Sequence, residues 1–236
     1  MNNIINIALL GYGKMGQMIE NAAGQHDMNV IIHYDENSLL QDSAEQRKLL
    51  DKVSVLVDFT TPSAVLRHVE LVAAMKKNMV IGTTGWQDQL PEVERIVKKN
   101  GIGLLYGANF SLGVNLFYKI SEFAARLFST FKNYDPYIEE SHHKMKKDAP
   151  SGTALVLKDL VQKYYADYNL PVSSTRAGYI PGSHSLNFDS AVDSVYIEHI
   201  ARGRQGLVEG TMLAVKWIHQ KKGIYAFNEV LDEILS

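Results

Sequence analysis

A glycine-rich loop near the N-terminus is the feature that most constrains the fold of this chain. Gly11, Gly13 and Gly16 form the pattern G-x-G-x-x-G, between the apolar run 4–10 and a helix expected over 17–23. The three glycines permit a tight turn, a close approach of backbone to a pyrophosphate, and packing of helix on strand, while the helix start offers N–H donors. An ordinary glycine-rich turn is the alternative, but this context favours dinucleotide binding. The predicted loop comprises Gly11, Tyr12, Gly13, Lys14, Met15 and Gly16.

Strand-like and helix-like runs alternate through the first hundred residues. Strands are expected over 4–10, 28–34, 53–59, 79–81 and 102–106, and helices over 17–23, from 61 onward and over 90–99. Continuous apolar runs are typical of strands buried on both faces. This β–α repetition predicts a parallel sheet with helices on both sides.

The pattern changes after Gly107. Helices are expected over 113–131 and 152–168, and strands over 137–141, 172–178 and 192–201, the last two joined by a polar loop. Longer strands with few helices suggest an α+β second domain. Two closing helices, 210–221 and 226–235, are separated by Gly223 as a helix stop and are expected to pack on the first domain.

Composition narrows the function classes. The chain has no cysteine, which excludes disulfides, Cys-ligated zinc and any thiolate nucleophile. Its net charge of −2 gives no general attraction for nucleic acid or for an anionic membrane. The first residues lack a signal-peptide pattern, and no apolar run is long enough for a membrane span, so we expect a cytoplasmic protein.

An acidic pair follows the second expected strand. Asp35 lies about 20 residues beyond the glycine loop, where a carboxylate holds the ribose hydroxyls of a dinucleotide. Glu36 adds a second negative charge, which would repel a 2′-phosphate, whereas Lys14 could reach one. We therefore predict NAD(P)H as cofactor, with a modest preference for NADH.

Two further loops, Gly82-Thr83-Thr84-Gly85 and Gly107-Ala108-Asn109-Phe110, each follow an expected strand. Ligands bind at the carboxyl ends of strands in such sheets, and small residues there let backbone amides approach a flat ring. Two ordinary β–α loops are the alternative interpretation.

The densest group of chemically active side chains is the run from His142 to Lys147, with two histidines and three lysines in six residues. Histidine exchanges protons near neutrality. Pro150, Ser151, Gly152 and Thr153 then read as a helix start, whose exposed N–H groups suit a carboxylate. A solvated basic loop is the competing interpretation. Adjacent histidines without a third ligand nearby make a poor zinc site, so no metal is predicted.

The segment from Glu140 to Ala154 matches the pattern E-x-H-x-x-x-K-x-D-x-P-S-G-T-A, and here the chain resembles the dihydrodipicolinate reductases, or 4-hydroxy-tetrahydrodipicolinate reductases, of diaminopimelate and lysine biosynthesis. Similar pieces occur in order elsewhere, so the resemblance covers most of the chain. They are the glycine loop, Asp58-Phe59-Thr60, Gly82-Thr83-Thr84-Gly85, Ala108-Asn109-Phe110-Ser111, Gly113-Val114-Asn115, Arg176-Ala177-Gly178 and Gly182-Ser183-His184.

The resemblance implies a Rossmann-type dinucleotide-binding domain of residues 1–112 plus 208–236, and an α+β domain of residues 113–207 for substrate binding and tetramerisation. It implies a homotetramer, a small dicarboxylate substrate, and hydride transfer from the nicotinamide to substrate C4. The chain is shorter than many members and has Gly107 where alanine is common. Glu36 replaces a basic residue that some members use for NADPH, which bears on cofactor preference and not on the reaction.

The resemblance also implies roles for individual residues. His142 would be the proton donor or acceptor, and Lys146 a proton donor or an electrostatic support. The substrate carboxylates would be held by His143, Ser151, Gly152 and Thr153. The remaining cofactor contacts would be Phe59, Thr60, Gly82, Thr83, Thr84, Gly107, Ala108, Asn109 and Phe110.

Other residues carry weaker predictions. His184 and His199 stand alone in sequence and are expected to be structural or loop histidines, and Trp86 and Trp217 to be packing residues. Arg202 and Arg204 suit either a solvated turn or a carboxylate contact. Two alternative functions stay open: a different small-acid dehydrogenase, and a nicotinamide-sensing regulator that is not an enzyme.

Overall fold

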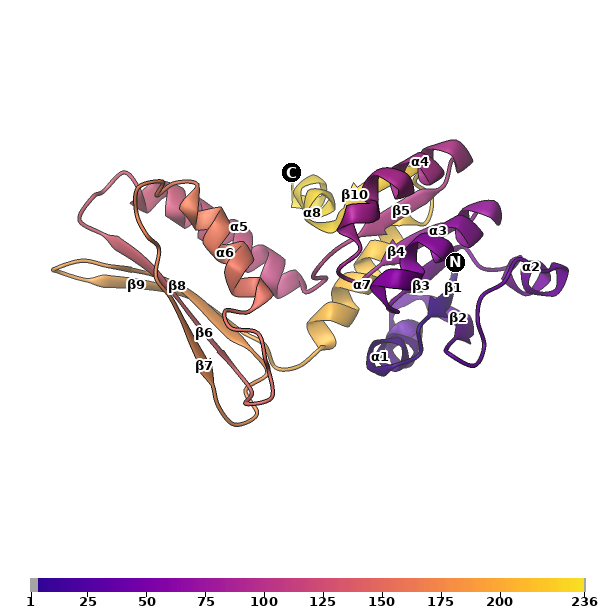
Figure 1. The fold of residues 1–236 in the computed structure, drawn as a ribbon, viewed down its shortest axis with the longest axis horizontal. Helices are drawn as coiled ribbons and strands as arrows, with labels where there is room; N and C mark the ends of the chain where they lie inside the picture. Colours follow the sequence, from indigo (N-terminus) through magenta and orange to yellow (C-terminus); the bar gives the residue numbers. More distant parts are fainter. Residues whose placement is uncertain (1–3, 236) are drawn as a thin grey trace. The chain divides into compact units, whose positions relative to one another are not determined.

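The computed structural model describes residues 4–235, and its chain divides into two compact units (Figure 1). The first unit contains the residues up to 111 and those from 207 onward; the second contains residues 112–206. No helix among residues 4–235 has the length and apolar character needed to cross a membrane.

The first unit is built on a six-stranded, fully parallel sheet with the strand order β10-β5-β4-β3-β1-β2. Its strands are β1 (Ile5–Leu10), β2 (Met28–Tyr34), β3 (Val55–Asp58), β4 (Asn78–Ile81), β5 (Gly103–Tyr106) and β10 (Gly223–Ala226). Its helices are α1 (Lys14–Ala23), α2 (Ala44–Leu50), α3 (Pro62–Ala74), α4 (Leu90–Asn100), α7 (Gln205–Ile218) and α8 (Phe227–Leu235), with the short 3₁₀ turns Gly24–His26 and Gln87–Gln89. The predicted Rossmann-type parallel sheet is confirmed.

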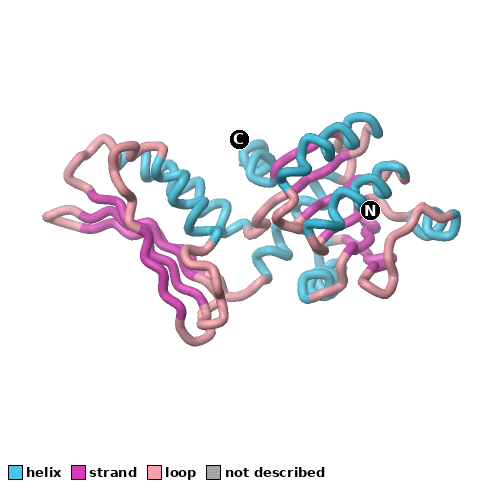
Figure 2. Tube along the Cα trace, viewed as in Figure 1, coloured by secondary structure: helices cyan, strands magenta, loops and turns pink. Residues whose placement is uncertain are grey.

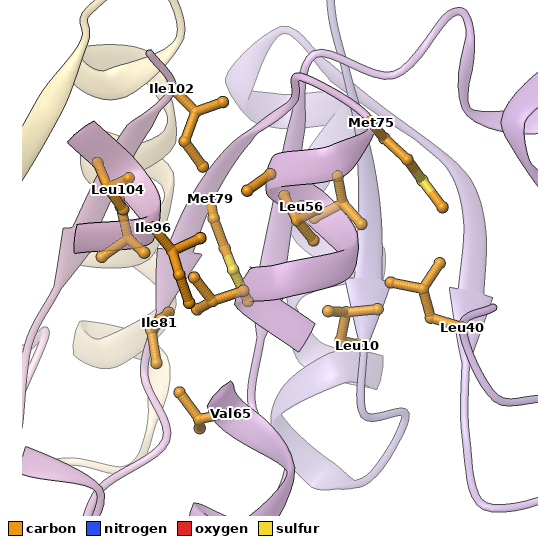
Figure 3. Close-up of a cluster of buried hydrophobic side chains, with 14 of the residues drawn as sticks. Leu10, Leu40, Leu56, Val65, Met75, Met79, Ile81, Ile96, Ile102 and Leu104 are labelled. Carbon is orange, nitrogen blue, oxygen red and sulfur yellow. The ribbon is translucent and has the colours of Figure 1, made fainter. Parts of the chain in front are cut away.

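Helices cover both faces of this sheet. On one face, Val65 of α3 and Ile96 of α4 pack in a single cluster with strand residues such as Leu56 and Met79 (Figure 3). On the other face lie α1 and α7 (Figure 1), and α7 is tied to the chain just beyond α1 by an ion pair from His26 to Glu209 at 3.3 Å. Because every central strand is covered on both faces, its ends are the places where a ligand can reach the sheet.

The second unit has a four-stranded mixed sheet in the order β7-β6-β8-β9. Its strands are β6 (Asp135–His142), β7 (Val172–Arg176), β8 (Ser183–Asp189) and β9 (Ser194–Ile200), and its helices are α5 (Leu112–Phe128) and α6 (Gly152–Gln162). Both helices cover one face of the sheet (Figure 2), where Phe117 and Leu157 pack against Ile138, Leu186 and Phe188. The predicted α+β second part is confirmed.

Two strands were missed by the sequence analysis. The expected polar loop before residue 192 is wrong in part, because residues 183–189 form the central strand β8. Its serines and asparagine hide an alternation in which His184, Leu186 and Phe188 are buried. Gly223 is more than a helix stop, since it begins β10, which pairs with β5.

Two helices end earlier than expected. Helix α5 stops at Phe128 rather than 131, and the hydroxyls of Ser129 and Thr130 bond to carbonyls of the preceding turn. Helix α6 stops at Gln162 rather than 168, and the Gln162 amide donates to the carbonyls of Tyr165 and Tyr168. In both cases local side-chain hydrogen bonds compete with continuation of the helix.

Candidate active site

The glycine loop between β1 and α1 needs its first and third glycines for space. Gly11 has a φ of 90°, and a Cβ there would lie 2.5 Å from the Phe59 carbonyl oxygen. A Cβ on Gly16 would lie 2.4 Å from the carbonyl oxygen of Gly11. A Cβ on Gly13 would meet nothing within 4 Å, so this position opens outward at the start of α1. This is the arrangement expected where backbone amides approach a pyrophosphate.

A cavity of about 560 Å³ opens beside this loop. It is lined by Leu10, Gly11, Tyr12, Gly13, Tyr34, Asp35, Glu36, Leu39, Leu40, Phe59, Thr60, Thr61, Ala64 and His68. The lining comes from the carboxyl ends of β1, β2 and β3 and from the first turns of α3, which is where a dinucleotide binds in such a sheet. No lysine or arginine is among these lining residues; Lys14 is exposed and lies outside them.

Asp35 stands at the end of β2, on the cavity wall, in a tight turn. Its Oδ1 accepts from the N–H groups of Asn37 (2.8 Å) and Ser38 (2.9 Å) and from the Ser38 hydroxyl (2.9 Å). These hydrogen bonds lower the pKa of Asp35, which therefore stays ionised. Glu36 beside it is exposed and also lines the cavity.

Tyr12 occupies the middle of the loop and is held by two contacts. Its ring stacks on His33 with centroids 3.6 Å apart, and its hydroxyl bonds to Glu20. Met15 is half-buried under the loop. These contacts fix the loop, and Gly13 and Lys14 remain its exposed residues.

A buried network missed by the sequence analysis lies below the cavity. Asp58 is fully buried, and its Oδ1 accepts from the Thr60 N–H (2.9 Å), the Thr60 hydroxyl (2.7 Å) and the Thr83 hydroxyl (2.8 Å). Its Oδ2 lies 2.8 Å from Nδ1 of His68, which lines the cavity. The predicted residues Thr60 and Thr83 are thus joined to each other through Asp58. The Thr83 hydroxyl is used in this network, and the Thr83 carbonyl accepts from the Trp86 indole N–H at 2.8 Å.

The two loops predicted to touch the nicotinamide lie at the carboxyl ends of β4 and β5. A Cβ on Gly82 would lie 2.1 Å from the Phe59 ring, and one on Gly107 would lie 3.1 Å from Phe227. Phe110 is buried and packs against Phe227 with ring centroids 4.7 Å apart, so it supports the loop from below. Thr84 and Ala108 are exposed and Asn109 is half-buried.

In the second unit, His142 is the last residue of β6 and forms a buried cluster with Glu140, Arg176 and His184. Its Nδ1 bonds to Oε2 of Glu140. Oε1 of Glu140 accepts from Nη2 of Arg176 at 2.6 Å. The His184 ring meets the His142 ring edge-on, with centroids 5.0 Å apart.

Burial and the neighbouring charges shift the pKa values of the residues in this cluster. Burial would raise the pKa of Glu140, but hydrogen bonds from Arg176, Ser174 and His142 outweigh it and lower the pKa to about 2. Burial lowers the pKa of His142, although Glu140 opposes this; Lys146 and Arg176 lower it further. Burial and the neighbouring His142 lower the pKa of His184 to about 4. The cluster therefore pairs an ionised carboxylate with imidazoles that are easily deprotonated.

Lys146 lies in the loop after β6, near enough to His142 to influence its titration. Its Nζ bonds to both carboxylate oxygens of Asp148 at 2.8 Å each, and Asp148 is the more exposed partner. Arg176 also donates to the carbonyl of Asp148 at 2.6 Å, which links this loop to the Glu140 pair.

The predicted helix start is confirmed at α6. The Ser151 hydroxyl accepts from the Ala154 N–H at 3.2 Å as an N-cap, and lies 3.0 Å from Nε2 of His184. Gly152 is exposed with open space at its Cβ position, and Thr153 is half-buried. The first amides of a helix lack intrahelical partners, so Gly152 and Thr153 offer donors to an anion. His143 is half-buried, and its buried Nδ1 has no partner among residues 4–235.

Residues that are separate in sequence meet at His142, where the fold adds Glu140 and His184 as neighbours. Glu140, His142 and His184 bring one ligand atom each to within 4.8 Å of the others. Both oxygens of Glu140 already bond to Arg176 and His142, so the group is organised first as a hydrogen-bonded acid–base cluster. Arg202 and Arg204 are exposed. An i, i+2 pattern of Glu140 and His142 on one strand was the signal that could have revealed their pairing.

Comparison with known proteins gives a consistent result. Residues 5–110 match the family model for the N-terminus of dihydrodipicolinate reductase, and residues 113–231 match the model for its C-terminus. The 4-hydroxy-tetrahydrodipicolinate reductase of Christiangramia forsetii is 34% identical over 242 residues, covering 98% of this chain and 99% of that protein. That of Methanocaldococcus jannaschii is 32% identical over 270 residues, covering 97% of each.

Solved structures share the fold. Dihydrodipicolinate reductase from Paenisporosarcina sp. TG-14, solved with dipicolinate bound, superposes with a TM-score of 0.81 at 24% identity, covering 96% of this chain and 99% of that one. Aspartate dehydrogenase from Thermotoga maritima superposes with a TM-score of 0.51 at 13% identity, covering 92% of this chain and 97% of that one.

Proposed function

The chain belongs to the dihydrodipicolinate reductase family, and on that premise we propose that it reduces 4-hydroxy-tetrahydrodipicolinate to tetrahydrodipicolinate in diaminopimelate and lysine biosynthesis. The observation that carries this proposal is the family match over nearly the whole chain, which includes the residues of the acid–base cluster at His142.

The first unit fits a nicotinamide dinucleotide. Gly13 leaves room for a pyrophosphate at the start of α1, and the cavity beside it is lined in part by Asp35, whose carboxylate suits ribose hydroxyls. NAD(P)H, when bound, supplies the hydride. The amides around Gly82 and Gly107 would hold its nicotinamide ring, with Phe59 and Phe110 supporting these loops.

A modest preference for NADH is part of the proposal. Asp35 and Glu36 both line the cavity, and the pKa of Asp35 is lowered, so negative charge is in place where a 2′-phosphate would lie. Like charges brought together without a compensating cation are unfavourable. Lys14 is the nearest part of the glycine loop that could compensate, and it does not line the cavity.

The second unit would carry out the proton transfer and bind the acidic substrate. Loss of the 4-hydroxyl as water leaves a conjugated imine, and addition of the hydride places negative charge on its nitrogen. His142, when protonated on both ring nitrogens, would quench this charge by giving up its Nε2 proton, which leaves the neutral ring with Nδ1–H. Lys146 would stabilise the developing charge as a cation. The amides of Gly152 and Thr153, with Ser151 as cap and His143 alongside, would hold the substrate carboxylates.

A coupled assay tests the proposal. Dihydrodipicolinate synthase makes the substrate in place from pyruvate and aspartate semialdehyde, and oxidation of NADH and NADPH is followed in parallel. We expect turnover with both cofactors and a higher kcat/KM with NADH. Turnover of other small acids alone would favour a different dehydrogenase, and tight cofactor binding without turnover would favour a sensor.

A further inference from the structure

A buried carboxylate stands directly behind the proposed proton-transfer residue. Glu140 and His142 are two residues apart on β6, so their side chains share one face of the sheet. The carboxylate is buried and is hydrogen-bonded by His142, by Arg176 and, at 3.4 Å, by the Ser151 N–H. An ionised carboxylate is costly to bury unless it is paired, so these contacts are what keep it charged.

This carboxylate decides which nitrogen of His142 carries hydrogen. An ionised carboxylate can only accept hydrogen bonds, and Glu140 is ionised at any pH well above 2. The atom of His142 that bonds to it is Nδ1, which must therefore be the donor. In the neutral ring, Nε2 is then left with the free lone pair.

The other side of the ring is kept open by a glycine. Gly182, immediately before β8, has a φ of 146°, and a Cβ there would lie 3.0 Å from Nε2 of His142 and 3.2 Å from its Cδ2. A side chain at this position would cover Nε2. With glycine, the space beside Nε2 stays free of a side chain from this position, while Nδ1 is held by Glu140.

We propose that Glu140 is a positioning residue that holds His142 in its Nδ1–H tautomer and directs Nε2 toward the substrate, and that Arg176 keeps Glu140 in place. The inference rests on the proposed function, in which His142 exchanges the proton. The charged or titratable groups that face His142 are Glu140 on its own strand, Arg176 on β7, Lys146 in the following loop and His184 on β8.

The kinetic test is Glu140→Gln, which keeps the shape and removes the charge. We expect kcat to fall by about 10²-fold, the scale of a positioned acid–base group, with the KM for NADH unchanged. Because Glu140 raises the pKa of His142, the limb of the pH profile that reports His142 should move to lower pH in the variant. Glu140→Asp restores the charge and should recover part of kcat and of the pH shift.

A matched control is Glu122→Gln, which removes a half-buried carboxylate of α5 that pairs with Lys163 at 3.5 Å. We expect this variant to keep the wild-type kcat and pH profile. A loss of kcat in Glu140→Gln without any shift of the pH profile, or with no recovery in Glu140→Asp, would overturn the positioning role.

The tautomer itself is measured by NMR of ¹⁵N-histidine-labelled protein, with the His142 signals assigned by their loss in His142→Gln. We expect the wild-type ring, above its pKa, to carry hydrogen on Nδ1. A wild-type ring with hydrogen on Nε2 would overturn the inference even if no Glu140 variant folds. This readout is independent of turnover, so an inactive wild-type protein would defeat the proposed function alone.

Discussion

At the scale of single residues, His142 and Lys146 have different proposed roles, so their variants should lose kcat for different reasons. We expect His142→Gln and Lys146→Ala each to lower kcat by about 10²-fold or more, because one loses the proton carrier and the other the supporting charge. Steady-state kinetics in the coupled assay measures this. Lys147→Ala, which removes an exposed neighbouring charge, should stay near the wild-type rate; near-normal kcat in the two site variants would reject both roles.

Cofactor preference also belongs to the residue scale. Glu36→Arg replaces a negative charge on the cavity wall with a positive one that can meet a 2′-phosphate. We expect the ratio of kcat/KM for NADPH to that for NADH to rise by about tenfold, which corresponds to about 1.4 kcal/mol. If the ratio stays the same, the acidic pair does not set the preference.

At the scale of elements, β8 connects the acid–base cluster to the core of the second sheet. His184 is buried on this strand, and its pKa is lowered from 6.5 to about 4 by burial first and by His142 next. The unfolded chain therefore binds a proton more readily than the folded one between these values. The folded state should lose stability as the pH falls from about 6.5 to about 4.

Urea unfolding at several pH values measures this loss, with His184→Gln as the comparison. The variant lacks the titrating ring, so its stability should change less across the same window. An equal slope in both proteins would show that other groups cause the acid sensitivity.

The elements differ in how well their sequences reveal them. Apart from β10, the first unit was predicted correctly as alternating strands and helices. Strands such as β1 and β3 are continuous apolar runs, the pattern of strands buried on both faces. Strand β8 was missed because Ser183, Ser185 and Asn187 alternate with its buried His184, Leu186 and Phe188, so that the segment reads as a polar loop. The ends of α5 and α6 were missed because side-chain hydrogen bonds to the backbone terminate them.

The residues of the candidate site also differ in how far the sequence could predict them. The glycine loop, Asp35, His142 and the cap at Ser151 lie within short motifs, so the sequence alone could propose them. For His142 and Ser151 the spacing left a solvated basic loop as an alternative, and the family resemblance decided between the two. The joining of Glu140 to Arg176, and of His184 to Ser151, depends on strand register in the second sheet, which a single sequence does not reveal. The pairing of Asp58 with His68 was also not predicted, because it depends on how α3 packs beside the end of β3.

At the scale of the whole molecule, the second sheet carries both helices of its own unit on one face, and apolar side chains in and beside β9 are exposed. Val192, Tyr196 and Ile200, in and beside β9, are 83%, 63% and 63% exposed. Exposed apolar patches of this kind mark protein–protein interfaces, and we propose that the homotetramer implied by the family resemblance buries them. We expect light scattering to give the mass of four chains for the wild type and a smaller mass for Tyr196→Asp. Leu49→Asp, at an exposed position on α2, serves as the control, and a wild-type monomer would contradict the proposal.

The central claim is that the chain transfers hydride to a small cyclic acid, and isotope transfer tests it most directly. The wild-type protein is given 4-deuterated NADH, with deuterium at the transferring position, and substrate made in place by dihydrodipicolinate synthase. The account predicts that the product, identified by mass spectrometry and NMR, is tetrahydrodipicolinate with one deuterium at C4. Oxidation of the cofactor with no deuterium in that product, or no oxidation at all, would contradict it.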